Sequence, residues 1–166
     1  MSNRSKKIFL ILTIVIPFLV YCIYYYGMMI KNAPYRYSDF ESISYTYGKK
    51  DSLINQFDSG TGNYQYLNKR DSLIKVHIRL TDNDLLYLHH KAADLGFWDF
   101  PSNEKGDTTL AVKPVRYVIA FKYKKKTKKV IFDSNFDGDP KLIDANKQLI
   151  KELDQSLETA ERRIKK

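Results

Sequence analysis

An uncharged run from Ile8 to Ile30 constrains this chain of 166 residues more than any other feature. As a helix, the run would extend about 35 Å, which exceeds the roughly 30 Å of a bilayer's hydrocarbon core. A helix satisfies its own backbone hydrogen bonds, so it can lie in lipid. Pro17 predicts a kink that membrane helices tolerate. Amphipathic rings that favour the headgroup level crowd the C-terminal third: Tyr21, Tyr24, Tyr25 and Tyr26. We therefore expect one membrane span over residues 8–30.

Two alternatives to an uncleaved signal-anchor are a cleaved signal peptide and a lipoprotein signal ending at Cys22. A signal peptide has an apolar region of roughly 7–15 residues followed by small residues, whereas this run is longer and no such pattern follows it. Tyr21 is bulky where a small residue should precede a lipidated cysteine. These departures favour the uncleaved signal-anchor.

The charges beside the run favour one orientation. Arg4, Lys6 and Lys7 lie immediately before it, whereas the downstream cations are spread along a long domain. Cationic flanks stay in the cytoplasm, and long domains translocate largely regardless of charge. We expect residues 1–7 to form a cytoplasmic tail, 31–38 a short connector and 39–166 an extracytoplasmic domain.

The composition of residues 31–166 excludes several chemistries. They hold 25 basic and 19 acidic residues, a net charge of +6, which is moderate for a domain of this size. Nucleic-acid binding requires basic charge concentrated on one face, and an exported domain has little access to nucleic acid. The only cysteine, Cys22, lies inside the run, so the domain has no disulfide, cysteine zinc site or thiol nucleophile.

The domain has the pattern of an α+β fold. Apolar residues alternate in the first strands and recur at helical spacing later. The expected order is β-β-β-β-α-β-β-α, with a mainly antiparallel sheet and two helices packed on one face. The expected strands are 40–47, 53–57, 64–67, 72–80, 115–123 and 128–132, and residues 102–113 are expected to form a polar loop.

Capping residues mark the two helices. Thr81 can cap a helix that begins at Asp82, and Gly96 is placed to end it. Asp139 and Pro140 predict the start of the last helix. The aromatic segment 97–100 (FWDF), which follows Gly96, has two interpretations: a plug of the core or a partner-binding hot spot.

Residues 133–139 (DSNFDGD) match the calcium-loop pattern D-x-[DN]-x-[DN]-G. The candidate oxygen ligands are Asp133, Asn135, Asp137, Asp139 and Asp144. Three departures count against calcium: Asp144 replaces the usual glutamate, Pro140 stands at the eighth position, and a strand precedes the loop. A tight strand-to-helix loop needs the same residue types. Both interpretations stay open here, and we expect no other cofactor.

A lysine run surrounds the turn between the last two expected strands. Its members are Lys122, Lys124, Lys125, Lys126, Lys128 and Lys129. We expect these side chains to line the tip and solvent face of a hairpin. They can serve as a solvated edge that discourages aggregation, or they can contact an acidic partner or lipid headgroups.

No catalytic motif is present in the sequence. His77, His89 and His90 are the only histidines, and the adjacent pair on a helix cannot share a metal as an i, i+4 pair would. Our leading hypothesis is a non-catalytic, membrane-anchored domain that binds another protein of a bacterial cell envelope. The alternatives are a calcium-dependent binding module that uses residues 133–144, and a membrane-anchored hydrolase with a cleft that combines a histidine and a carboxylate.

Overall fold

The computed structural model describes residues 3–31, 35–49, 52–107 and 113–165, and it divides the chain into two compact units, Met1–Pro34 and Tyr35–Lys166. The first unit is helix α1 (Asn3–Lys31), which contains Pro17. Within the described ranges, no helix combines the length and the apolarity needed to cross a membrane. The span predicted for residues 8–30 stays a prediction.

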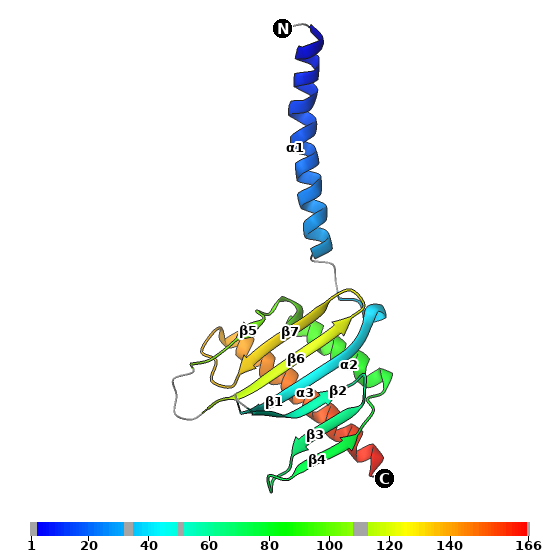
Figure 1. The fold of residues 1–166 in the computed structure, drawn as a ribbon, viewed down its shortest axis with the longest axis vertical. Coiled ribbons are helices and arrows are strands. Elements are labelled where there is room, and N and C mark those ends of the chain that lie inside the picture. The colour runs from blue at the N-terminus through cyan, green and yellow to red at the C-terminus, as the bar shows by residue number, and fades with distance from the viewer. Residues whose placement is uncertain (1–2, 32–34, 50–51, 108–112, 166) are drawn as a thin grey trace. The chain divides into compact units, whose positions relative to one another are not determined.

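The second unit is an α+β domain built on a curled seven-stranded sheet with the order β4-β3-β2-β1-β6-β7-β5 (Figure 1). Neighbouring strands are antiparallel except β5 and β7, which are parallel. The elements are η1 (Tyr37–Asp39), β1 (Phe40–Lys49), β2 (Ser52–Asp58), β3 (Asn63–Leu67), β4 (Leu73–His77), α2 (Asp82–Asp94), η2 (Phe97–Asp99), β5 (Asn103–Glu104), β6 (Val115–Tyr123), β7 (Thr127–Asp133) and α3 (Pro140–Ile164).

The predicted α+β class and the antiparallel run of the first four strands are confirmed. Two details are wrong. Residues 103 and 104, expected in a polar loop, form β5, because the chain passes beside the edge of β7. The fourth strand, expected to reach residue 80, ends at His77, although Ile78 and Leu80 beyond it are still buried. The sequence also predicts a turn over residues 48–51, but residues 48 and 49 belong to β1, and residues 50 and 51 lie outside the described residues.

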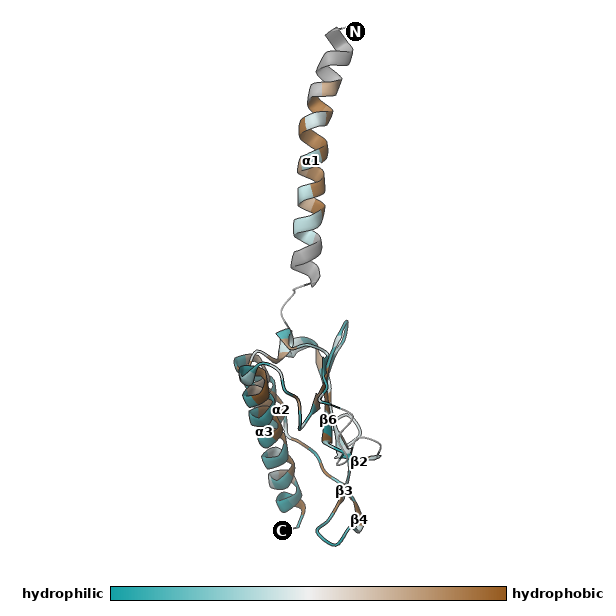
Figure 2. Ribbon diagram, turned by 90° about the vertical axis from the view of Figure 1, so that its left-hand side faces the viewer, coloured by the Kyte–Doolittle hydropathy of each residue, from teal (hydrophilic) through white to brown (hydrophobic). Residues whose placement is uncertain are grey.

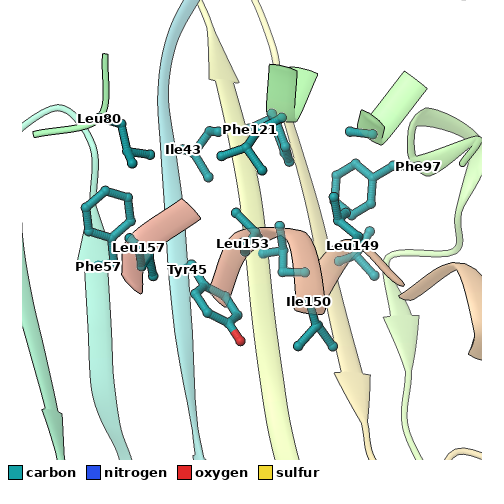
Figure 3. Packing of buried hydrophobic residues seen from close by; sticks show 14 of the residues in the cluster. Ile43, Tyr45, Phe57, Leu80, Phe97, Phe121, Leu149, Ile150, Leu153 and Leu157 are labelled. Atoms are coloured by element: carbon teal, nitrogen blue, oxygen red, sulfur yellow. The ribbon is translucent and has the colours of Figure 1, made fainter. Parts of the chain in front are cut away.

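Helices α2 and α3 cover one face of the sheet (Figure 2). Leu149, Leu153 and Leu157 of α3 are fully buried or nearly so against the central strands, as Figure 3 shows. Phe97 and Phe100 are buried in the same core, which confirms the plug interpretation for these two rings. Each buried side chain of this size contributes about 1.5–3 kcal/mol, so this layer supplies most of the stability.

Local signals fix both helices where the sequence predicts them. Thr81 and Asp84 form a capping box at the start of α2. Gly96 follows α2 with φ +75°, a left-handed conformation that glycine adopts without a Cβ clash. Asp139 caps α3 by accepting from the amide of Lys141.

Three tyrosine hydroxyls tie α3 to the rest of the domain. They come from β1, β3 and α2, and each donates to a carboxylate of α3. The pairs are Tyr45 and Asp154 at 3.1 Å, Tyr66 and Glu161 at 2.9 Å, and Tyr87 and Glu152 at 2.8 Å. Two of these bonds hold α3 to the sheet and the third holds it to α2, so α3 cannot slide along the sheet without breaking the bonds from Tyr45 and Tyr66.

Candidate functional site

The face of the sheet opposite the helices carries polar residues in two cross-strand rows. The first row, named the Ser44 row, runs through Lys129, Ala120, Ser44, Asp58, Asn63 and His77. The second, named the Thr46 row, runs through Ile131, Val118, Thr46, Gln56, Gln65 and Lys75. Side chains of directly paired residues project from the same face, so the two rows lie side by side on one open surface.

The β1–β4 part of this surface forms an open groove of about 610 Å³. Its lining residues are Ser44, Thr46, Gln56, Phe57, Asp58, Thr61, Asn63, Tyr64, Gln65, Lys75, Val76 and His77. Asp58 and Lys75 offset each other in charge, and most of the remaining lining is neutral and polar. Such a surface can exchange hydrogen bonds with a neutral polar ligand, and it lacks the basic density that phosphate binding needs.

The groove contains a histidine and a carboxylate, the combination expected of a hydrolase. Asp58, however, uses its Oδ1 to accept from the amides of Gly60 and Thr61 at 2.8 and 3.0 Å. His77 is exposed, and across the described part of the chain no hydrogen bond joins it to Asp58. The turn holds the carboxylate, so His77 is not oriented by it as a catalytic base would be.

Carboxylate oxygens of three predicted calcium ligands, Asp133, Asp139 and Asp144, are engaged in other contacts. Arg116 pairs with both oxygens of Asp133 at 2.7 and 2.8 Å, and Asp133 is fully buried. The side-chain Nδ2 of Asn135 donates to the carbonyl of Asp107 at 2.9 Å, and the carboxylate of Asp144 accepts from the side-chain amide of Gln148. In the described ranges, no three or more His, Cys, Asp or Glu side chains gather as a metal site would need. These contacts favour the loop interpretation.

The lysine run divides between two faces of the hairpin. Lys122 and Lys129 belong to the open face, and Lys122 pairs with Glu41 at 2.9 Å. Lys124, Lys125 and Lys126 form the β6–β7 turn. Lys128 instead pairs with Phe121 on the covered face, and its Nζ donates to the carbonyl of Phe100. Burial lowers the pKa of Lys128.

Glu104 on β5 is a fully buried carboxyl, and no sequence pattern predicts its place inside the core. Its Oε2 accepts from Nδ2 of Asn146 on α3 at 2.5 Å. Burial raises the pKa of Glu104 to about 6, against the opposing influence of Asn146 and Lys128. This hydrogen bond joins β5 to α3.

His89 lies inside an aromatic cluster beside the start of the domain. Its Nε2–H donates to the carbonyl of Tyr35 at 3.1 Å, and the ring of Trp98 lies 5.5 Å away. Burial lowers the pKa of His89. His90 follows it, and the adjacent pair forms no metal site in the described residues.

The groove is the functional candidate that sequence reasoning missed. Alternation alone places Ser44 and Thr46 on the side of β1 opposite Ile43 and Tyr45, and it places Lys75 and His77 on the side of β4 opposite Ile74 and Val76. The missing information was the strand register, which brings these residues together with Gln56 and Gln65.

Comparison with known families and curated proteins identifies no relative. No family model matches the chain, and no curated protein does either. Functional inference therefore rests on the residues themselves.

Proposed function

We propose that this chain is a single-pass, membrane-anchored module of a bacterial cell envelope that binds another envelope protein through the groove of its open sheet face. The anchor rests on the uncharged run from Ile8 to Ile30. Apolar side chains along the described part of α1 support it, since Phe9, Ile16 and Ile23 are 66%, 53% and 72% exposed. Apolar surface of this extent favours lipid or another apolar cover.

The proposed orientation places residues 39–166 outside the cytoplasm. Three cations precede the run, and connector residues 31–38 lead directly into the domain. Protease added to the outside of intact cells with a permeable outer layer should digest the domain and leave the N-terminal segment with the membrane. A domain that stays protected until the cells are lysed would contradict this orientation.

The groove is the single observation on which the proposal of protein binding rests. A sheet face that is polar, half-buried and uncovered by any described helix offers neutral hydrogen-bonding groups across four strands. Ser, Thr, Asn and Gln donate to and accept from a polypeptide backbone without requiring charge. This chemistry suits an extended or loop segment of a protein partner.

Affinity isolation from native membranes tests the binding surface. The variant Gln56→Arg/Gln65→Arg fills the groove with two long side chains, and Gln148→Arg/Gln155→Arg makes the same change at exposed positions of α3. We expect the groove variant to recover about tenfold less partner, a loss of about 1.4 kcal/mol, and the α3 variant to recover as much as the native chain. Equal recovery by both variants would contradict the proposal, provided that both melt as the native chain does.

A hydrolase is the second candidate because His77 and Asp58 line the same groove. It predicts turnover of ester or amide probes that His77→Ala abolishes while leaving partner recovery unchanged. The binding proposal predicts no His77-dependent turnover.

A further inference from the structure

The β6–β7 turn lies beside the residues through which the chain enters the domain. The amide of Lys124 donates to the carbonyl of Asp39 at 2.9 Å, and its Nζ reaches the carbonyl of Ser38 at 3.4 Å. The Nζ of Lys126 lies 3.8 Å from the centre of the Tyr35 ring. A turn nearly ninety positions further along the chain is therefore held against the domain's first described residues.

Aromatic rings support this end of the domain. The ring of Tyr35 stacks on that of Trp98 at 4.6 Å, with 22° between their planes, and contacts the ring of Tyr123 at 5.0 Å. Trp98 is half-buried, whereas its neighbours Phe97 and Phe100 are buried. Tyrosine and tryptophan in partly exposed positions suit the interface between water and lipid headgroups.

The charge of the same surface is positive. Arg36, Lys124 and Lys125 are exposed, and Lys126 lies above Tyr35. Among the described residues, two carboxylates lie near this surface: Asp39, which is 3.9 Å from Nζ of Lys124, and Asp99, which adds to the larger effect of burial in raising the pKa of Tyr35. Four cations against two carboxylates leave a net charge of +2.

We propose that this surface, made of Tyr35, Arg36, Trp98 and Lys124–Lys126, docks on anionic lipid headgroups. The inference rests on the proposed membrane anchor, because only residues 32–34 stand between Tyr35 and the last residue of α1 in the sequence. Each lysine near an anionic surface raises the docked-to-undocked ratio about fivefold. An acidic protein would be attracted by the same charges, but the aromatic rings at the domain's entry favour a lipid interface.

Trp98 reports on docking without labelling because it is the only tryptophan in the chain. The full chain is reconstituted into nanodiscs of phosphatidylcholine, with or without phosphatidylglycerol, and Trp98 is quenched by acrylamide. We expect quenching about twofold weaker in the anionic discs at low salt, with the difference removed at high salt because ions screen the attraction.

Matched variants assign the effect to the turn. In the turn variant Lys124→Gln/Lys125→Gln/Lys126→Gln, we expect acrylamide to quench Trp98 equally in both kinds of disc. Lys141→Gln/Lys147→Gln/Lys151→Gln, which removes the same charge from exposed positions of α3, should behave as the native chain does. Equal quenching of the native chain in both discs would overturn the docking proposal, and so would a turn variant that keeps the difference. Protection that appears only when native membrane proteins are added would assign the surface to an acidic protein and overturn lipid docking. A chain that fails to enter either disc contradicts the anchor instead.

Discussion

Adjacent rows of the same strands form two different surfaces. The row through Tyr45 runs along Val130, Ile119, Tyr45, Phe57, Tyr64 and Val76, and it faces α2 and α3. The Thr46 row, one residue further along β1, carries polar side chains on the opposite face. A strand alternates its side chains between faces, so one sequence serves both purposes. A single step along each strand therefore separates the side chains that stabilise the fold from those that we propose bind a partner.

The largest expected effect lies on the covered face. Phe121→Ala and Leu153→Ala each remove a fully buried side chain and should lower the free energy of unfolding by about 3–5 kcal/mol. Gln56→Ala, on the open face, should change it by less than about 1 kcal/mol. Urea unfolding of the full chain in detergent measures both. Similar losses on the two faces would contradict the separation.

The next effect concerns a charge pair at the rim of the open face. Arg116→Ala leaves Asp133 buried without its bidentate partner and should cost about 3 kcal/mol. Adding Asp133→Asn should recover part of the loss, since the buried charge is then gone. A double variant less stable than Arg116→Ala would show that Asp133 is not stabilised chiefly through this pair.

A smaller effect depends on pH and on Glu104. Its pKa is about 6 in the folded chain, above the ordinary value of 4.5, so the folded state holds the proton more tightly. This contribution to stability is complete below pH 4.5 and is lost as the pH rises through 6, a change of about 2 kcal/mol. Glu104→Gln should remove the loss, and Glu158→Gln, on the exposed side of α3, should not. If the free energy of unfolding changes with pH in the same way for the native chain and for Glu104→Gln, the prediction is wrong.

The smallest expected effect is the response to calcium. Because Arg116 occupies both oxygens of Asp133, millimolar calcium should leave the melting temperature unchanged. A rise of several degrees that Asp137→Asn abolishes would restore the calcium interpretation of residues 133–144.

The sequence predicted much of the covered face. Alternation located β1 and β6, and capping residues located both ends of α2 and the start of α3. It missed β5, because two residues carry no periodicity and their pairing depends on where the chain passes. It also missed the burial of Glu104, since a charged residue in a polar stretch gives no sign of a buried partner such as Asn146.

The candidate site was only half predictable. The outward positions of Ser44, Thr46, Lys75 and His77 follow from alternation within single strands. Their assembly into one groove depends on the register among four strands, which no local pattern encodes. The position of the lysine turn beside Tyr35 likewise follows from tertiary contacts alone.

Photocrosslinking from the two sides of the domain tests the central claim most directly. A photoreactive residue replaces Gln65 in the groove or Lys151 on the exposed side of α3, and native membranes are irradiated. Binding through the open face predicts an adduct with one envelope protein from position 65 and none from position 151. An adduct of equal yield from both positions, or from position 151 alone, would contradict it.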